Sequence, residues 1–283
     1  MNRFELLDSL SLPGHPDKPN DDAFAFDVTA AVVLDGATGL GDPLMPGQSD
    51  AAWLARFGAN RLMAHIRQGE KPGDALRHSL AEAETSFKAL RRCEPKETYE
   101  IPFASMMLVV IGEGGIEAMW YGDCAALVKR AGEPVELVGE AIEKRELEAA
   151  RVAKLAAKHN LSPAARFNRP EYLSALRRAR NRVNSDSAYW LFGPDASAAE
   201  HASDGIVAVS HGALVLLATD GFLALVSDYR RYTAETLMEA ANTVGLKKLG
   251  EELRVIETGD SEGRRYPRFK TSDDATALLL RVA

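Results

Sequence analysis

The chain has 283 residues, of which 46% are hydrophobic, and this is enough apolar material for a sizeable buried core. Its 41 acidic and 34 basic side chains give a formal net charge of -7, which argues against duplex nucleic acid as a partner. Cys93 and Cys124 have neither disulfide nor zinc-site spacing, and no apolar stretch approaches the roughly 18 residues of a membrane helix. We therefore expect a globular, cytoplasmic protein that binds neither nucleic acid nor a membrane.

The N-terminal third of the chain is expected to contain a loop, two strands and two helices. Residues 11–22 hold three prolines and a glycine, which predicts an irregular loop. Residues 23–27 alternate, and residues 30–34 form a continuous apolar run typical of a strand covered on both faces. A helix capped by Ser49 is expected over 49–62. Apolar residues spaced three and four positions apart predict a second helix over 74–91.

The middle of the chain changes to glycine-separated apolar runs and then to a basic segment. The runs between 103 and 138 are separated by glycine turns, including Gly122-Asp123, and this spacing predicts an antiparallel meander. Helical character returns over 141–182. From Lys144 to Arg182 this segment contains eleven Lys and Arg residues but only three Glu. The simplest organisation is a single domain over residues 1–283 with a basic helical insertion at about 141–185.

The last third is expected to contain strands and then a helical pair before a closing strand. The expected strands lie at 188–192, 206–209, 213–219 and 275–282, and the expected helices at 233–243 and 245–256. The second and third of these strands are separated by Ser210-His211-Gly212, which predicts a hairpin.

Acidic residues recur at the ends of these strands. They are Asp21-Asp22, Asp35-Gly36, Asp123, Asp220-Gly221 and Asp273-Asp274. Taken singly, an aspartate at a strand end is most often a turn former. Carboxylates that converge without a cation repel and raise each other's pKa values, so a convergent set implies bound Mg²⁺ or Mn²⁺. Periodicity alone does not show whether these residues converge.

The ordered set of motifs resembles the metal-dependent serine/threonine protein phosphatases of the 2C type. The motifs are Asn20-Asp21-Asp22-Ala23-Phe24, Val33-Leu34-Asp35-Gly36, Gly122-Asp123-Cys124-Ala125, Leu217-Ala218-Thr219-Asp220-Gly221-Phe222 and Asp273-Asp274-Ala275-Thr276. Their order and intervals match that family from about residue 10 to 282. The resemblance implies an α+β fold, a four-layer α/β/β/α sandwich of two mainly antiparallel sheets with helices outside.

The resemblance also implies an active site at one edge of the sandwich, with two Mn²⁺ or Mg²⁺ ions that share a bridging water. Asp35 would bridge both metals and the carbonyl of Gly36 would bind one of them. Asp220 and Asp273 would hold the other metal, and Asp21 and Asp22 would act directly or through water. Asp123 matches a residue that helps to bind a third, weaker metal.

The chain departs from the family pattern around the substrate phosphate. Asp17 stands where many members have a phosphate-binding arginine, and the adjacent Lys18 offers a point charge instead of a bidentate fork. Ala37 replaces a histidine that protonates the leaving group in animal members. Asp21 replaces a glutamate, and Ala224 replaces a second aspartate near the third metal.

Three residues are candidates for the missing roles. The basic segment occupies the place of the family's variable flap, so Arg166 or Arg169 is a candidate phosphate ligand; a solvated helix face is the alternative. His15 is a candidate acid, and a loop histidine without a role is its alternative.

The resulting hypothesis is a phosphatase that hydrolyses phosphomonoesters, with phosphoserine or phosphothreonine in proteins as the expected substrate. Two alternatives stay open at this point. One is a phosphatase of a small phosphorylated metabolite, because a fold does not fix its substrate. The other is a binding or regulatory module that has kept the fold and lost efficient turnover.

Overall fold

The computed structural model describes residues 2–140, 170–185, 189–268 and 270–283, and its strands form two five-stranded sheets. Sheet A has the order β1-β10-β9-β6-β7 and sheet B the order β2-β3-β4-β5-β8. All paired neighbours are antiparallel. The strands of sheet A are β1 (Phe4–Leu12), β6 (Ala125–Lys129), β7 (Glu136–Val138), β9 (Leu214–Ala218) and β10 (Ala275–Val282). Those of sheet B are β2 (Asp22–Phe26), β3 (Ala30–Gly36), β4 (Ala104–Gly112), β5 (Gly115–Tyr121) and β8 (Ser203–Val207).

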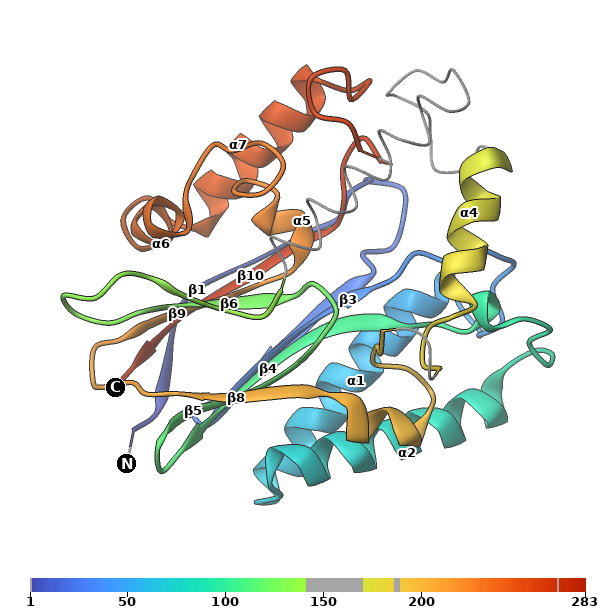
Figure 1. The fold of residues 1–283 in the computed structure, drawn as a ribbon, viewed down its shortest axis with the longest axis horizontal. Coiled ribbons are helices and arrows are strands. Elements are labelled where there is room, and N and C mark those ends of the chain that lie inside the picture. Colours follow the sequence, from blue (N-terminus) through green and yellow to red (C-terminus); the bar gives the residue numbers. More distant parts are fainter. Residues whose placement is uncertain (1, 141–169, 186–188, 269) are drawn as a thin grey trace.

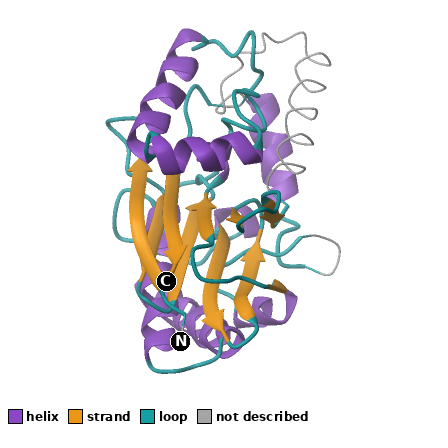
Figure 2. Ribbon diagram, turned by 90° about the vertical axis from the view of Figure 1, so that its left-hand side faces the viewer, coloured by secondary structure: helices purple, strands orange, loops and turns teal. Residues whose placement is uncertain are grey.

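Helices cover the outer face of each sheet, which confirms the expected four-layer sandwich (Figures 1 and 2). Sheet B is covered by α1 (Asp50–Arg67) and α2 (Pro72–Leu90). Sheet A is covered by α5 (Asp220–Leu223), α6 (Ala234–Thr243) and α7 (Leu246–Gly259). The described residues also form η1 (Thr98–Glu100), α4 (Pro170–Arg180) and η2 (Ala196–His201).

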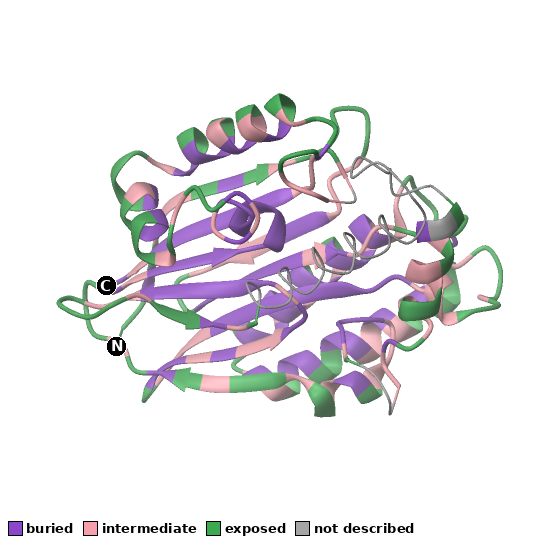
Figure 3. Ribbon diagram, turned by 45° about the horizontal axis from the view of Figure 1, so that its top comes forward, coloured by how far each residue is buried: buried purple, intermediate pink, exposed green. Residues whose placement is uncertain are grey.

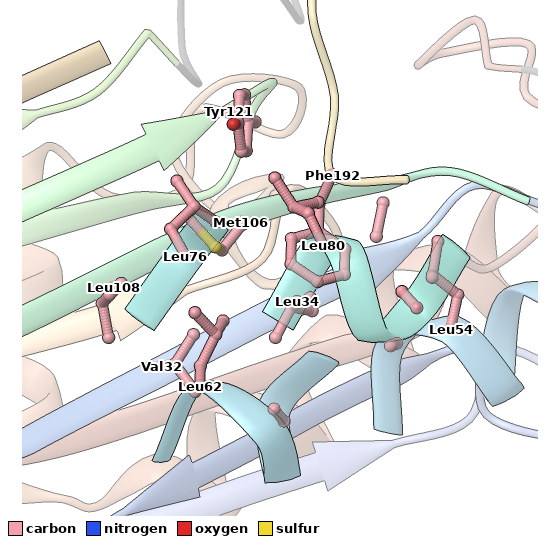
Figure 4. Packing of buried hydrophobic residues seen from close by; sticks show 14 of the residues in the cluster. Val32, Leu34, Leu54, Leu62, Leu76, Leu80, Met106, Leu108, Tyr121 and Phe192 are labelled. Atoms are coloured by element: carbon pink, nitrogen blue, oxygen red, sulfur yellow. The ribbon is translucent and has the colours of Figure 1, made fainter. Parts of the chain in front are cut away.

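The buried residues form a layer between the sheets and a layer beneath each helical pair (Figure 3). The apolar run of β3 is fully buried because its side chains alternate between these layers. Leu34 contacts the α1–α2 side together with Leu80 and Phe192 (Figure 4), whereas Val33 faces sheet A. Full burial of a leucine side chain such as that of Leu34 contributes about 1.5–3 kcal/mol to the free energy of unfolding.

The start of α1 is fixed by a side-chain cap, as the sequence predicts. Ser49 has an extended backbone, and its Oγ accepts a hydrogen bond from the Ala52 N–H at 3.2 Å. The apolar stripes of α1 and α2 both face sheet B, which explains their helical periodicity. Among the helices that the structure describes, none has the length and hydropathy of a membrane-spanning segment.

Two predicted strand connections are wrong because the chain crosses between the sheets at those points. The expected meander over 103–138 is a β4–β5 hairpin in sheet B followed by β6 and β7 in sheet A. Gly122, with φ of +69°, redirects the chain at the crossing. The expected hairpin on either side of His211 is also split, since β8 pairs with β5 and β9 with β6 and β10.

Other boundaries differ in detail. β1 was not expected, and it takes up the start of the predicted loop by pairing along β10. Of the expected strand at 188–192, the described residues form only an isolated bridge between Phe192 and Ala104. Within the expected helical segment the structure describes α4, and residues 141–169 lie outside the described part of the chain.

Candidate metal and phosphate site

Adjacent strands of sheet B bring three of the predicted residues to one edge. Asp22 begins β2 and Asp35 ends the apolar run of β3, and the two residues are direct partners in the strand register. On the other side of Asp35 the register partner is Ser105 of β4, whose Oγ donates to Asp123 Oδ1 at 2.5 Å. The order across the sheet is therefore Asp22, Asp35, Ser105 and Asp123.

Sheet A delivers its acidic residues to the same edge. Asp220 follows β9 and opens α5, while Asp273 and Asp274 precede β10. Thr219 joins the two sheets, because its Oγ1 donates to Asp22 Oδ2 at 2.9 Å and accepts the Thr276 N–H at 3.0 Å. The acidic strand ends that the sequence left unplaced thus converge.

The centre of the site is a group of three carboxylates, Asp35, Asp123 and Asp220. One oxygen from each lies within 4.8 Å of the others, and the three residues come from β3, the turn after β5 and the start of α5. Burial raises the pKa of Asp35 well above its ordinary value, and the carboxylates of Asp220 and Asp22 raise it further. Burial and the carboxylate of Asp274 act in the same way on the pKa of Asp22. A cation placed among these groups would relieve this repulsion.

The donor set fits a hard divalent cation. Every candidate ligand is an oxygen, which Mg²⁺ and Mn²⁺ prefer. Asp22 is 4% exposed, and its Oδ1 has no hydrogen-bond partner among the residues that the structure describes. A buried carboxylate oxygen without a donor is costly unless a cation binds nearby.

Two glycines allow the backbone to pack closely around this centre. A Cβ on Gly36 would lie 2.6 Å from the Asp21 carbonyl oxygen and 2.8 Å from the Ala51 carbonyl oxygen. A Cβ on Gly221 would lie 1.9 Å from the Asp274 carbonyl oxygen. The glycines after Asp35 and Asp220 are therefore required by close backbone packing, a reason that the motif alone did not reveal.

Asp274 has a role that the sequence interpretation missed. Its carboxylate accepts the Gly14 N–H at 2.6 Å and the Asp21 N–H at 2.8 Å, which ties the loop before β2 to the segment before β10. Asp21 is also held by Ser49, the cap of α1, whose Oγ donates to Asp21 Oδ1. Burial raises the pKa of Asp21, although the hydrogen bond from Ser49 opposes this shift.

Lys270 was also missed, and it is a positive charge inside the acidic site. Its Nζ binds Asp273 Oδ1 at 2.6 Å. Burial lowers the pKa of Lys270, but the carboxylates of Asp273, Asp35 and Asp220 outweigh burial and raise that pKa above its ordinary value. The only signal in the sequence is a lysine three residues before Asp273.

The described phosphate and acid candidates, Lys18 and His15, have contacts within their own loop. Lys18 is exposed, and its backbone N–H donates to the His15 carbonyl at 3.2 Å. His15 is also exposed, and its Nδ1 accepts the Asp17 N–H at 3.2 Å. Arg166 and Arg169 lie outside the described residues.

The described part of the basic segment contacts the loop that follows the Asp35-Gly36 corner. In α4, Arg177 donates from Nε and Nη2 to the Leu40 carbonyl at 2.8 and 2.6 Å. Its guanidinium also lies over the Tyr99 ring, 4.7 Å from the centroid. Arg177 therefore fastens α4 to the loop around Leu40 and to Tyr99.

Comparisons with known proteins agree with this arrangement. The sequence profile described as protein phosphatase 2C matches residues 15–254. The serine/threonine phosphatase PstP/Ppp of Mycobacterium tuberculosis has a TM-score of 0.58 at 14% identity, over 99% of this chain and 98% of its own. The Ser-Thr phosphatase MsPP of Mycobacterium smegmatis, in complex with cacodylate, has a TM-score of 0.58 at 15% identity, over 98% and 99%.

A PstP catalytic domain in complex with two manganese ions has a TM-score of 0.57 at 14% identity, with 100% of both chains covered. A comparison with curated protein sequences gives no match. At these identities the structural likeness establishes the fold, two antiparallel sheets between helical layers.

Proposed function

The chain belongs to the protein phosphatase 2C family, and from that premise we propose that it hydrolyses phosphoserine and phosphothreonine in proteins with the help of two divalent cations. The observation that carries the proposal is the convergence of Asp35, Asp123 and Asp220, which reach one point from separate parts of the fold. The family membership supports a metal-dependent phosphatase, and the protein substrate is the finer part of the proposal.

The proposed metal ligands are the acidic strand ends with one backbone carbonyl. They are Asp21, Asp22, Asp35, Asp123, Asp220 and Asp273, with the carbonyl oxygen of Gly36. Asp35 is assigned to both Mn²⁺ or Mg²⁺ ions because it lies centrally, beside Asp22 in the sheet and within 4.8 Å of Asp123 and Asp220. Asp123 is assigned to a third, weaker ion.

Two divalent cations held there would supply the water activation and the charge compensation that phosphoryl transfer requires. The residues of the chain hold this site in shape. Strand pairing fixes Asp22 beside Asp35, and Thr219 locks Asp22 to sheet A. Asp274 fixes the backbone of Asp21, and Lys270 holds Asp273. Such fixed positions reduce the reorganisation that metal and substrate binding would otherwise need.

A binding or regulatory module is the second candidate function. Lys270 favours it, since its ammonium group already binds one of the proposed metal ligands. The position occupied by Asp17 favours it as well, because an acidic side chain there repels a phosphate. The two free cysteines, exposed Cys93 and buried Cys124, support a reducing location such as the cytoplasm for either candidate.

The experiment measures phosphate release from a phosphothreonine peptide and from p-nitrophenyl phosphate. Wild-type protein is assayed with Mn²⁺, with Mg²⁺ and with a chelator, beside Asp35→Asn and the control Asp204→Asn, an exposed position on β8. We expect Mn²⁺-dependent hydrolysis of both compounds by the wild type and the control, and loss of activity in Asp35→Asn.

Three outcomes would overturn parts of the proposal. A wild-type protein without metal-dependent hydrolysis would point to the binding module. Activity on p-nitrophenyl phosphate and small phosphorylated metabolites, but not on phosphopeptides, would retain the phosphatase and reject the protein substrate. Activity that survives Asp35→Asn would reject the metal assignment itself.

A further inference from the structure

A second cluster of metal-binding side chains lies on the helical layer outside sheet B. It consists of His65 near the end of α1, Glu70 in the loop that follows, and His78 in α2. One donor atom from each residue lies within 4.8 Å of the other two. We propose that this α1–α2 histidine cluster binds a borderline transition metal ion, such as Zn²⁺, and thereby fastens the end of α1 to α2.

The backbone holds Glu70 in place for this role. Gly69 has φ of +87° at the end of α1, and its N–H donates to the Ile66 carbonyl at 2.9 Å. The Glu70 N–H then donates back to the His65 carbonyl at 3.2 Å. This pair of bonds is a Schellman motif, and it sets Glu70 directly beside His65.

The carboxylate of Glu70 lies between the two rings. His65 Nδ1 is 2.9 Å from Glu70 Oε1, and His78 Nδ1 is 2.7 Å from Glu70 Oε2. A tetrahedral zinc ion with bonds of about 2.0–2.1 Å separates its ligand atoms by about 3.3 Å. Small rotations of the side chains are therefore enough to place an ion among the three donors.

The other nitrogen of the His65 ring already has the partner that a metal-bound histidine needs. His65 Nε2 lies 3.2 Å from Glu82 Oε1, which also accepts a hydrogen bond from Arg61 Nη2 at 2.7 Å. A metal-bound imidazole commonly donates its second N–H to a carboxylate in this way, and that bond fixes the tautomer.

The number of N–H donors on the His65 ring also favours a bound cation. A neutral imidazole has one N–H, so His65 donates to only one of its two carboxylate neighbours, Glu70 Oε1 at 2.9 Å from Nδ1 or Glu82 Oε1 at 3.2 Å from Nε2. The other ring nitrogen then faces a carboxylate oxygen with its lone pair, an arrangement that repels unless a proton or a metal ion lies between the two atoms.

The cluster differs from the phosphatase site in position and in ligand chemistry. Ser49 contacts Asp21 at the first turn of α1, and His65 lies sixteen residues further, about 24 Å along the helix axis. Two imidazoles and one carboxylate favour Zn²⁺, Co²⁺ or Ni²⁺, whereas the all-oxygen site favours Mg²⁺ or Mn²⁺. The inference therefore does not depend on the proposed function.

The test compares the full-length wild type with His78→Ala, Glu70→Gln and the control His211→Ala. His78 is 54% exposed on its side chain, so its replacement leaves the core intact, and His211 is an exposed histidine outside the cluster. After chelation each protein is titrated with Zn²⁺ by calorimetry and with Co²⁺ by visible absorption.

We expect the wild type and His211→Ala to bind one more Zn²⁺ per chain than His78→Ala and Glu70→Gln. They should also show the visible Co²⁺ bands of a four-coordinate site with mixed nitrogen and oxygen ligands, which both cluster variants lack. Glu82→Gln should weaken Zn²⁺ binding about 10–100-fold, because it removes the carboxylate that orients His65. Mn²⁺-dependent activity should be the same in all these proteins.

Equal Zn²⁺ stoichiometry and equal Co²⁺ spectra in the wild type and His78→Ala would overturn the proposal. The two histidines would then be proton donors to Glu70 and nothing more. A Co²⁺ spectrum of six-coordinate oxygen ligation alone would have the same consequence, since it would place the ion with the carboxylates of the other site.

Discussion

Asp274→Ala is expected to destabilise the protein by releasing the backbone beside the candidate site. The substitution removes the carboxylate that accepts the Gly14 N–H at 2.6 Å and the Asp21 N–H at 2.8 Å. A hydrogen bond to a charged acceptor contributes about 1.5–3 kcal/mol, and partial exposure reduces this figure. Removal of the pair should cost about 2–4 kcal/mol of unfolding free energy, which lowers the melting temperature by on the order of 5–10 °C.

An opposing effect makes this prediction informative. The charge of Asp274 raises the pKa values of Asp21 and Asp22, so its removal also relieves repulsion. Asp274→Asn separates the two effects, because it removes the charge and keeps one acceptor oxygen. We expect the order of stability to be wild type, then Asp274→Asn, then Asp274→Ala.

The assay is thermal unfolding in chelator, followed by a Mn²⁺ titration of activity. Both variants should need more Mn²⁺ for half-maximal activity, because Asp21 is no longer fixed. An Asp274→Asn protein more stable than the wild type would refute the reasoning, since repulsion would then dominate the hydrogen bonds.

Three further predictions concern the Asp35 corner. Gly36→Ala, whose Cβ would lie 2.6 Å from the Asp21 carbonyl oxygen, should cost about 1–3 kcal/mol of unfolding free energy, measured by urea denaturation. In chelator, Asp35→Asn should melt higher than the wild type at pH 7, because burial and neighbouring carboxylates raise the pKa of Asp35 above its unfolded value. Wild-type stability falls as pH rises through that raised pKa, so the difference should shrink on acidification. Arg177→Ala, which loses two hydrogen bonds to Leu40, should speed proteolysis of the adjoining loop without changing Mn²⁺ binding.

Most helices and strands could be predicted from local patterns, but the sheet to which each strand belongs could not. The apolar run of β3 and the stripes of α1 and α2 were predicted because burial repeats at the period of the element. The spacing of apolar side chains along a strand does not show which other strand it pairs with. The glycine turns at Gly122 and Gly212 look like hairpin turns, yet the chain changes sheets at both. The pairing of β1 with β10 joins the two ends of the chain, which no local pattern reports.

The candidate site shows the same division. The predicted aspartates were recognised from the order of short motifs, and the structure brings Asp35, Asp123 and Asp220 together. Asp274 and Lys270 were missed because their roles depend on contacts with segments far away in sequence or with several carboxylates at once. Gly36 was expected for its carbonyl, and only the packed backbone shows why a side chain does not fit.

The most direct test of the account is anomalous diffraction from crystals grown with Mn²⁺. The account predicts two manganese peaks about 3.5–4 Å apart, on either side of the Asp35 carboxylate and within reach of Asp22, Asp220 and Asp273. Manganese that binds elsewhere and leaves the Asp35 carboxylate without a metal contact would contradict it.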